Sequence, residues 1–343
     1  MAAAYSLAGN LSLRPFNTLG VDATAAWVAT VHDPQVLPDV LALPQARDGA
    51  MVLGEGSNVL FAGDYPGMIV KLAFDAVRTA EDEGDTALVR AEAGCRWDPL
   101  VDWTMQRGLR GLENLALIPG LAGAAPIQNI GAYGVEIAEF ITTVEAFDRR
   151  DGRSVCLDRA MCRFGYRDSL FKDDLGRWIV CAIELRLSRQ RDLTLGYAGV
   201  GDELASLGVT SPCATDVAEA VRRLRRRKLP DPSVVGNAGS FFKNPIVPDF
   251  LADALRSAHP AIPVHPAGSA RKLSAAWLIE QCGWRGFREG DAGISAQHAL
   301  VLVNHGKATG AQLLSLARRV AGSVQERFGV TLEPEPRIVG ATF

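Results

Sequence analysis

The loop that decides the fold reads Leu53-Gly-Glu-Gly-Ser-Asn-Val-Leu-Phe61 and follows the apolar segment 50–53, which predicts a β-strand. A Gly-x-Gly turn after a strand is typical of dinucleotide-binding folds, in which a helix begins at once and its N-terminus holds the phosphate. Here Val59 occupies the third glycine position, and the chain continues to Gly63 without a helical pattern. We therefore set a Rossmann fold aside. Two alternatives stay open: a loop whose backbone amides converge on a phosphate, or a tight turn alone.

A second glycine-rich segment, residues 118–134, carries almost no charge. It contains Gly120, Gly123, Gly131 and Gly134. Because glycine has no side chain, it lets the backbone approach a ligand closely. A flat, uncharged ring system attached to a bent diphosphate requires such an approach. The segment therefore favours a flavin-dinucleotide channel over a purely structural loop.

The composition is that of a soluble globular protein with more than one domain. The chain has 343 residues, of which 48% are hydrophobic and 22% charged. The net charge of −3 provides no global field for nucleic acid, so an anionic ligand must be held by local cations. The scattered cysteines and histidines have no zinc spacing, which predicts reduced thiols and no metal site. Residues 1–13 lack the pattern of a signal peptide and no stretch suits a membrane span, so we expect a cytoplasmic protein.

The first 190 residues mix short strands with helices and glycine loops, which indicates an α+β fold. In this half we predict strands at 68–70, 88–91 and 178–187, helices at 33–46 and 98–107, and a hairpin over 144–157 that turns at Asp151-Gly152. Residues 188–212 are turn-rich and mark a boundary. Beyond it we predict helices at 215–228, 248–258, 274–282 and 309–328, and strands at 299–303 and 330–332.

The segment Asn237-Ala-Gly-Ser-Phe-Phe-Lys-Asn-Pro245 holds the residues best suited to chemistry. Gly239 allows a backbone turn that exposes the hydroxyl of Ser240, and the two phenylalanines that follow can wall off a reacting centre. Lys243 and Asn244 add a cation and an amide. The alternative is a turn that leads into a buried aromatic pair.

Together these motifs resemble the UDP-N-acetylenolpyruvoylglucosamine reductase (MurB) family, flavoenzymes of bacterial cell-wall synthesis. The resemblance extends from Asn17 to Arg337. In the family's order, its motifs occupy residues 53–61, 111–115, 126–134, 163–169, 228–232, 239–245 and 332–335. Two departures are Ala124 and Ala125, where members often carry serine.

The resemblance implies an α+β fold with a two-lobed FAD-binding domain of the vanillyl-alcohol-oxidase (PCMH) type and a C-terminal α+β substrate-binding domain. The FAD-binding domain would cover residues 15–190, with lobes of roughly 15–70 and 71–190. Residues 191–214 would form a linker and a tyrosine loop, which the family's longer class places over the substrate. Residues 215–330 would bind substrate, and residues 331–343 would return to the active site.

The implied activity is the reduction of UDP-N-acetylglucosamine-enolpyruvate to UDP-N-acetylmuramate in peptidoglycan precursor synthesis. NADPH would reduce FAD, and the flavin would then deliver hydride to the enolpyruvyl ether in a single-site ping-pong cycle. We expect a monomer with no nucleic-acid or membrane partner.

Three residues of the matching motifs carry the implied chemistry. The alkene of an enol ether resists hydride unless its carboxylate is polarised by fixed cations. Arg167 would hold that carboxylate, against the alternative of a surface arginine paired with Asp168 or Asp173. Glu335 would orient Arg167 or relay a proton, and Ser240 would protonate the second alkene carbon.

The resemblance assigns the remaining site residues to two groups. The cofactor-binding residues would be Gly54, Glu55, Gly56, Ser57, Asn58, Pro119, Gly120, Gly123, Gln128, Asn129, Ile130, Gly131, Tyr133, Arg225 and Arg337. The substrate-binding residues would be Tyr166, Tyr197, Lys228, Asn244 and His298, with Gln297 as the alternative to His298.

Two alternative functions fit the sequence less well. An alcohol oxidase of the same flavin architecture often tethers flavin through His or Cys, which residues 54–61 lack. A flavin-binding sensor of sugar nucleotides would not need Ser240, Arg167 and Glu335.

Residues 222–228 carry six cations without interleaved aromatics, so we expect solvated arginines at 222, 223 and 226 rather than a nucleic-acid site.

Overall fold

The computed structural model describes residues 3–343, and the chain divides into two compact units. The first unit comprises the described residues up to 11, together with 25–55 and 66–226. The second comprises 12–24, 56–65 and 227–343. The second unit therefore contains two short segments from the N-terminal part of the chain in addition to the C-terminal third.

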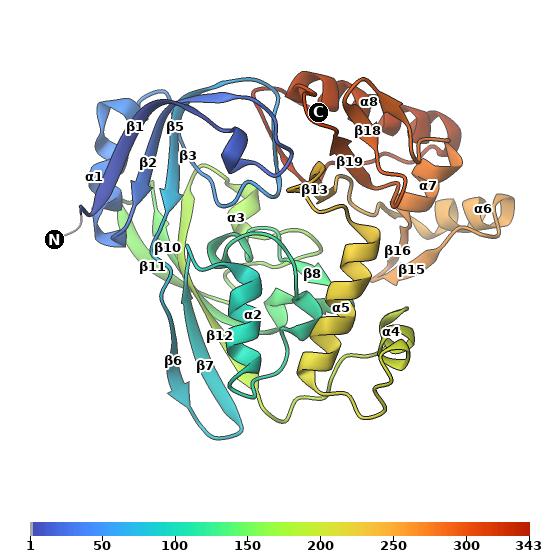
Figure 1. Ribbon diagram of the computed structural model, residues 1–343, viewed down its shortest axis with the longest axis horizontal. Helices are drawn as coiled ribbons and strands as arrows, with labels where there is room; N and C mark the ends of the chain where they lie inside the picture. The colour runs from blue at the N-terminus through green and yellow to red at the C-terminus, as the bar shows by residue number, and fades with distance from the viewer. Residues whose placement is uncertain (1–2) are drawn as a thin grey trace. The chain divides into compact units, whose positions relative to one another are not determined.

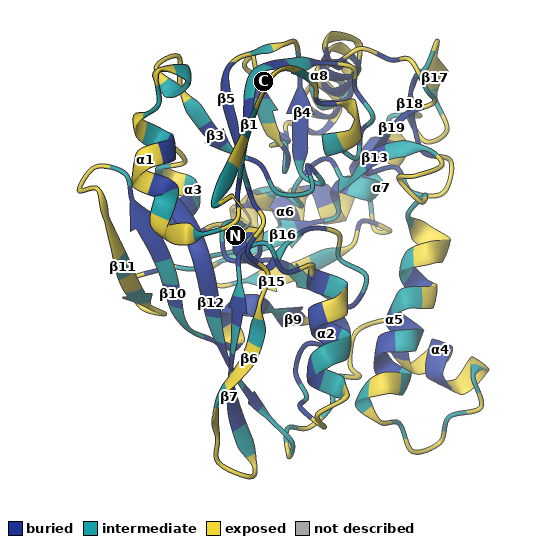
Figure 2. Ribbon diagram, turned by 60° about the vertical axis from the view of Figure 1, so that its left-hand side comes forward, coloured by how far each residue is buried: buried dark blue, intermediate teal, exposed yellow. Residues whose placement is uncertain are grey.

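A five-stranded sheet in the order β11-β10-β12-β7-β6 forms the centre of the first unit (Figure 1). Its strands are β6 (Val77–Asp82), β7 (Thr86–Glu92), β10 (Ile141–Asp148), β11 (Arg153–Asp158) and β12 (Trp178–Ser188). The inner strands β10 and β12 are mostly buried (Figure 2). The predicted hairpin is confirmed: β10 and β11 pair antiparallel, and Gly152 takes the positive φ that its turn requires.

A second, four-stranded sheet has the order β1-β2-β5-β3. It contains β1 (Tyr5–Ser12), β2 (Thr24–Val31), β3 (Ala50–Val52) and β5 (Tyr65–Leu72), and β3 runs parallel to β5. The single helix predicted at 33–46 is wrong in one respect. Asp33 caps its start as expected, but the segment breaks into η2 (Pro34–Val36), α1 (Leu37–Ala42) and η3 (Pro44–Ala46). Leu43 is extended, with ψ 144°, because a residue before proline avoids the helical region.

Helices and short turns make up the rest of the first unit. They are α2 (Trp97–Met105), η4 (Glu113–Leu115), η5 (Ala122–Ala124), η6 (Ile137–Glu139), α3 (Leu170–Asp173), α4 (Val200–Ser206) and α5 (Ala214–Lys228), with the short pair β8 (Gly131–Ala132) and β9 (Val135–Glu136). Of these, η5 packs against strands β7 and β12. The predicted helices at 98–107 and 215–228 are confirmed as α2 and α5. These two lie side by side, and Arg222 of α5 donates to Asp98 and Asp102 of α2 at 2.9 and 2.8 Å (Figure 1). The prediction of a solvated Arg222 is therefore wrong: Asp98 and Asp102 attract its guanidinium onto α2.

The second unit has a four-stranded sheet in the order β13-β19-β18-β17, against which α8 packs. Its elements are β13 (Gly236–Ser240), β17 (Arg288–Glu289), β18 (Ala292–Ile294), β19 (Val301–Asn304), α7 (Ala275–Gln281) and α8 (Gly310–Phe328). A smaller sheet contains β14 (Ile246–Val247), β15 (Val264–Ala267) and β16 (Ala270–Leu273), next to α6 (Asp249–Ala258). The predicted C-terminal helices are confirmed by α6, α7 and α8, and the strand predicted at 299–303 by β19.

The last strand of the second unit lies later than the sequence indicated. Residues 330–332 form no strand; Val330 and Leu332 are buried just after Gly329 ends α8 with φ 67°. Such an apolar contact commonly follows a left-handed helix end. The strand is β20 (Arg337–Val339), which pairs in parallel with β4 (Val59–Phe61).

Candidate active site

The loop after β3 is fixed by a glycine and a glutamate. A Cβ at Gly56 would lie 2.0 Å from the carbonyl oxygen of Phe16, and φ is +64°, so only glycine fits. The Glu55 carboxylate accepts from the backbone N–H of Gly120 and from Nε of Arg96, each at 2.9 Å. Glu55 therefore ties its own loop to the second glycine-rich segment.

Two cations near Glu55 were missed by the sequence analysis. Arg96 forms the ion pair described above, and Lys71 lies close enough to Glu55 for their charges to interact. Burial lowers the pKa of the Lys71 ammonium, and the Glu55 carboxylate opposes this effect. Neither cation belongs to a recognisable motif, since each reaches the loop only through the fold.

The glycine-rich segment from residue 118 packs closely on the end of β7. Gly120 has φ +125° and accepts from the backbone N–H of Trp97 at 3.0 Å. A Cβ at Gly123 would lie 2.6 Å from the Cβ of Ala93. Glycine is therefore required at Gly120 by its positive φ and at Gly123 by the close approach of Ala93, and the need for a close ligand approach stays a prediction.

Asn129 organises the next turn of the same segment. Its Nδ2 donates to Glu136 Oε2 at 2.8 Å and to the carbonyl of Gly165 at 2.9 Å, while its Oδ1 accepts from the N–H of Ala138 at 3.0 Å. The residue is buried and has a left-handed φ of 45°. Its amide therefore joins the 126–134 motif to the 163–169 motif within the first unit.

Arg167 lies on this joined structure. Its guanidinium donates to the carbonyl of Gly131, and its Nη1 is 4.0 Å from Glu136 Oε1. Its backbone has φ +54°, an unusual value for arginine that points to a special constraint. Asp173, one of the alternative partners considered for Arg167, instead pairs with Arg163 at 2.6 Å.

A second guanidinium, that of Arg225 on α5, shares the electrostatic environment of Arg167. Its Nε donates to the carbonyl of Leu117 at 3.2 Å. Burial lowers the pKa of Arg225, the like charge of Arg167 lowers it further, and Tyr133 and Asp98 oppose the shift. Two partly desolvated cations in one unit favour an anionic group between or beside them.

The other predicted residues of the first unit lie on the same loops. Tyr166 packs its ring 5.2 Å from the guanidinium carbon of Arg167. Tyr133 and Tyr197 form an edge-to-face pair with ring centroids 5.2 Å apart. Gly54, Pro119, Gln128 and Ile130 flank the residues described above; Pro119 is exposed and Ile130 is buried.

In the second unit, Ser240 ends strand β13, whose pairing with β19 has an irregularity between Asn237 and Ser240. Asn237 holds this turn by donating to the carbonyls of Pro230 and Val235, both at 2.9 Å, and by accepting from Gly239 N–H at 3.0 Å. Gly239 takes φ +68°. Ser240 is partly exposed, while Phe241 and Phe242 are buried, so the motif contains both a turn that exposes Ser240 and the buried aromatic pair considered from the sequence.

The C-terminal motif lies beside the Ser240 motif. The backbone N–H of Glu335 donates to the carbonyl of Phe241 at 2.8 Å, and that of Lys243 donates to the carbonyl of Glu333 at 2.9 Å. Phe242 and Pro334 form a β-bridge between these bonds. Two segments about ninety residues apart in the sequence are thus neighbours within the second unit.

Asn58 and Arg337 belong to the same neighbourhood. Asn58 Nδ2 donates to the carbonyl of Glu335 at 3.3 Å, and the N–H of Arg337 donates to the carbonyl of Asn58 at 3.0 Å. Burial lowers the pKa of the Arg337 guanidinium, and Tyr65 opposes the shift. The residue Ser57 precedes Asn58 on this loop and is partly exposed.

His298 lies in a cationic environment. Its Nδ1 accepts from the backbone N–H of Leu300 at 3.3 Å, which places the ring proton on Nε2. Burial lowers the pKa of His298, and the charges of Lys228 and Arg285 lower it further. Arg285, which the sequence analysis missed, donates from Nε to the carbonyl of Ala296 at 2.8 Å and so holds the turn that carries His298. Gln297 beside it is exposed.

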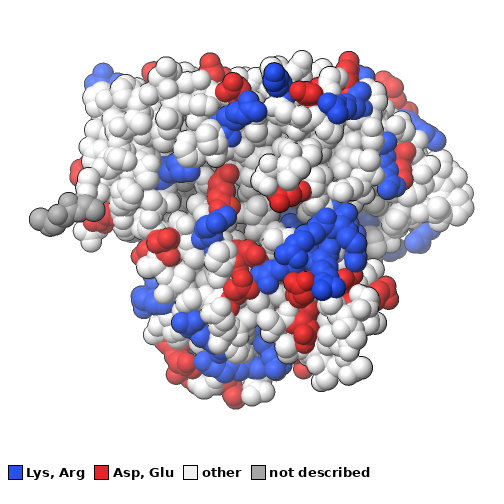
Figure 3. Space-filling model, viewed as in Figure 1, with Lys and Arg blue, Asp and Glu red and all other residues white. Residues whose placement is uncertain are grey.

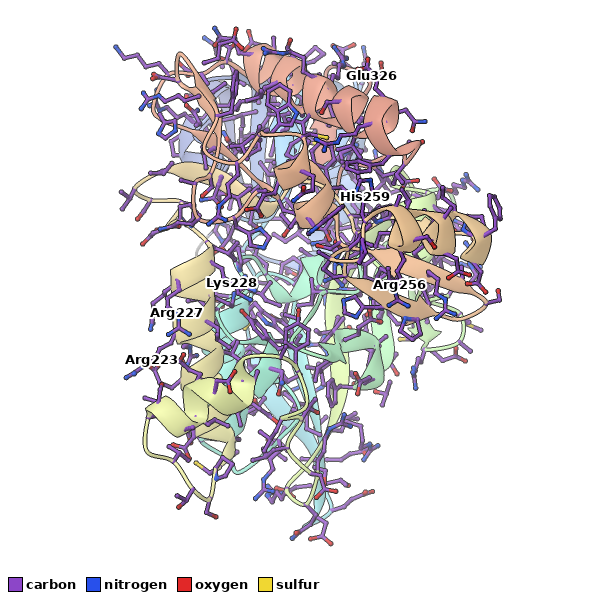
Figure 4. The ribbon with its side chains drawn as sticks, turned by 90° about the vertical axis from the view of Figure 1, so that its right-hand side faces the viewer. Arg223, Arg227, Lys228, Arg256, His259 and Glu326 are labelled. Carbon is purple, nitrogen blue, oxygen red and sulfur yellow. The ribbon has the colours of Figure 1, made fainter. Side chains whose placement is uncertain are left out.

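Lys228 and Asn244 complete the predicted residues of the second unit. Lys228 ends helix α5, where Figure 4 shows it next to Arg227. Asn244 Oδ1 accepts from the N–H of Ala275 at 2.9 Å, in the first turn of α7, whose N-cap is Ser274. The first turn of α7 therefore fixes the orientation of the Asn244 side-chain amide.

Residues 3–343 contain neither a membrane-spanning helix nor a metal-binding cluster. Across residues 3–343, no helix has the length and apolar character that a membrane crossing requires. Within the same range, no three His, Cys, Asp or Glu side chains are grouped closely enough to bind a metal ion.

Comparisons with known proteins define the class of this chain. Residues 25–158 match the family described as an FAD binding domain. Residues 231–339 match the family described as the C-terminal domain of UDP-N-acetylenolpyruvoylglucosamine reductase. The chain is an FAD-dependent oxidoreductase with an α+β fold, in which an FAD-binding domain is followed by a C-terminal α+β domain.

Full-length relatives identify the family. The chain is 56% identical over 342 residues to the UDP-N-acetylenolpyruvoylglucosamine reductase of Xanthomonas euvesicatoria pv. vesicatoria (strain 85-10), covering 98% of this chain and 97% of that protein. It is 53% identical over 340 residues to the reductase of Xylella fastidiosa (strain M12), with the same coverage. The crystal structure of the reductase from Thermus caldophilus has a TM-score of 0.65 at 26% identity, covering 97% of this chain and 98% of that one. The chain belongs to the UDP-N-acetylenolpyruvoylglucosamine reductase family.

Proposed function

We propose that this chain catalyses the NADPH-dependent reduction of UDP-N-acetylglucosamine-enolpyruvate to UDP-N-acetylmuramate. Its full-length similarity to reductases of that name supports the reaction. The observation that carries the proposal is the pairing of residues 333–335 with residues 241–243, because it places Glu335 beside the motif that presents Ser240.

The glycine-rich loops of the chain suit FAD. The Gly120–Gly134 segment is glycine-rich and nearly uncharged, and Glu55 holds it against the first loop. The residues that would hold the cofactor are those predicted above on residues 54–58, 119–123 and 128–133, with Arg225 and Arg337. When bound, FAD would supply the hydride for the substrate alkene, with NADPH as its source.

The chain's own residues prepare the alkene for that hydride. Arg167 binds the enolpyruvyl carboxylate, and its charge stabilises the negative charge that develops there. Glu335 orients Arg167 or relays a proton. The Ser240 hydroxyl donates a proton to the second alkene carbon, and nearby cations make that donation easier.

The second unit provides groups for the sugar nucleotide. Lys228 and the Nε2–H of His298 suit the negatively charged diphosphate, because both are donors in a region that already contains Arg285. Asn244 would contribute a further contact, as would Tyr166 and Tyr197 of the first unit. The irregular segment around Tyr197 corresponds to the tyrosine loop of the family's longer class.

Ser240→Ala tests the assignment of the proton donor. We expect NADPH to reduce the flavin at the normal rate and the enolpyruvyl substrate to re-oxidise it about 10²–10⁴-fold more slowly, the range for a lost general acid. Stopped-flow absorbance separates the two half-reactions. Ser257→Ala, on the exposed face of α6, is the matched control. Unimpaired re-oxidation in Ser240→Ala would rule out this role.

The domain assignments are part of the same proposal. Residues 15–190 bind FAD, 191–214 link the domains and carry Tyr197, 215–330 bind substrate, and 331–343 bring Glu335 to the site. We further propose a cytoplasmic monomer in which NADPH and substrate use one site in turn. Parallel initial-velocity lines would support that cycle, and crossing lines would contradict it.

A further inference from the structure

The segment that carries Tyr197 has no regular secondary structure, yet it is fastened to the first unit at several points. Arg191 pairs with Glu139 at 2.7 Å, and its guanidinium carbon lies 4.7 Å from the ring centroid of Phe140. Arg110 donates to the carbonyl of Arg191 at 3.3 Å. The carbonyl of Thr194 accepts a further bond, from Asn114 at 2.9 Å. The segment is therefore a tethered strap rather than a free loop.

Asn114 is the most deeply buried of these tethers. It lies in η4 with no exposed surface. One Nδ2 proton goes to the carbonyl of Thr194 and the other to the carbonyl of Tyr133, each at 2.9 Å. Its Oδ1 is buried without a hydrogen-bond partner in the structure, which disfavours an amide at this position. The side chain's contribution therefore lies in its two donors, which join the strap to the turn at Tyr133.

The two carbonyls that Asn114 joins belong to segments whose side chains also meet. Tyr133 and Tyr197 have ring centroids 5.2 Å apart at an interplanar angle of 70°. A Cβ at Gly134, where φ is +85°, would lie 3.5 Å from Thr194 Cγ2 and 3.9 Å from Tyr197 Cβ. Tyr197 remains 47% exposed, so one edge of its ring is fixed while the rest is accessible.

We propose that Asn114 is a positioning residue that sets the place of Tyr197 by binding the strap, residues 189–199, to the turn at Tyr133. This inference rests on the proposed function, in which Tyr133 contacts the cofactor and Tyr197 the substrate. The turn at Tyr133 and the strap that carries Tyr197 are then joined by hydrogen bonds into one structure. Removing the Asn114 donors frees the strap and weakens sugar-nucleotide binding.

Amide hydrogen exchange tests the tether without any substrate. In Asn114→Ala we expect the amides of residues 192–199 to exchange about tenfold faster, which corresponds to ~1.4 kcal/mol of lost protection. Asn237→Ala is the matched control, because Asn237 also donates to two backbone carbonyls at 2.9 Å, but in the second unit. Faster exchange spread over the whole first unit, or no change at 192–199, would overturn the proposal.

A double-mutant cycle tests whether Asn114 acts through Tyr197. We expect Asn114→Ala and Tyr197→Ala each to raise KM for the enolpyruvyl sugar nucleotide about tenfold, and the double variant to be no worse than Tyr197→Ala. Additive losses would contradict the proposal. If the variants change exchange at 192–199 but KM stays constant, the tether is real and the proposed role of Tyr197 in substrate binding fails instead.

Discussion

At the residue scale, His298 shows what a motif can and cannot indicate. The sequence identified the position by resemblance, with Gln297 as an alternative. The structure adds that His298 Nδ1 is an acceptor and that the charges of Lys228 and Arg285 act on the ring. Arg285 could not be found from the sequence, because only the folded chain brings it to the carbonyl of Ala296. Asn114 is a similar case: nothing in an apolar stretch shows that one amide joins two distant carbonyls.

The lowered pKa of His298 makes a prediction about stability against pH. Because the folded-state pKa lies below the ordinary value of 6.5, the unfolded chain binds the proton more readily. The free energy of unfolding is thus unaffected above about pH 6.5 and falls as pH decreases from there toward the lower folded pKa. His298→Gln should remove this part of the fall. Urea unfolding between about pH 5 and 7 measures it; equal pH profiles for variant and wild type would contradict the prediction.

At the element scale, local signals predicted most of the helices and the β10–β11 hairpin. Helix α8 begins with a Thr309–Gln312 capping box and ends at Gly329, so its spacing and caps agree. The two wrong predictions, a single helix at 33–46 and a solvated Arg222, also have physical causes. Proline at position 44 divided a periodic segment, and Arg222 met two carboxylates that only the packing of α2 against α5 provides. The spacing of residues in the sequence does not indicate that Asp98 and Asp102 lie next to Arg222.

Asp148 is the last residue of β10 before the hairpin turn, and its carboxylate binds Arg177 at 2.6 Å. The Arg177 hydrogen bond is the main cause that lowers the pKa of Asp148 to about 2. Stability from the ionised carboxylate is present above about pH 4 and is lost as pH falls toward 2. Asp148→Asn should unfold at lower urea at neutral pH and show a flatter profile between about pH 4 and 2. Asp151→Asn, at the same hairpin turn, is the control; if both variants respond alike, Asp148 has no special role.

At the scale of the whole molecule, the sequence could not show how the second unit is assembled. Strand β4 pairs with β20, nearly three hundred residues later, and Asn304 donates to the carbonyl of Leu19 at 2.9 Å. A Cβ at Gly310 would lie 1.7 Å from the carbonyl oxygen of Phe61, so α8 begins directly against β4. No local sequence pattern predicts these contacts between distant residues. The candidate site residues were instead predicted from the family's motifs.

The charge distribution of the molecule leads to a prediction about association with ligands. The net charge is −3, yet Figure 3 shows a dense group of cations over α5, and Figure 4 shows Arg223, Arg227 and Lys228 on this helix. NADPH and the sugar nucleotide are both polyanions. Changing Arg223, Arg226 and Arg227 to Gln should lower kcat/KM for both, on the order of tenfold at low salt, and leave kcat unchanged. Steady-state kinetics over a series of salt concentrations measures kcat/KM and kcat for both ligands.

A second triple variant provides the control for this charge effect. Arg150, Arg153 and Arg159 lie on or next to β11 and are exposed, so changing them to Gln alters the net charge equally. We expect kcat/KM to stay near the wild-type value in this control. At about 1 M salt, where screening extends over ~3 Å, all three proteins should agree. A deficit in the α5 variant that persists at high salt would mean direct contact instead of long-range attraction.

The absorption spectrum of the purified protein, recorded during sequential additions, tests the central claim most directly. We predict the visible bands of bound oxidised flavin, their loss on anaerobic addition of NADPH, and their return when UDP-N-acetylglucosamine-enolpyruvate is added. UDP-N-acetylglucosamine, which lacks the alkene, should leave the protein bleached. A colourless protein that takes up no FAD, or a reduced flavin that the enolpyruvyl compound does not re-oxidise, would contradict the account.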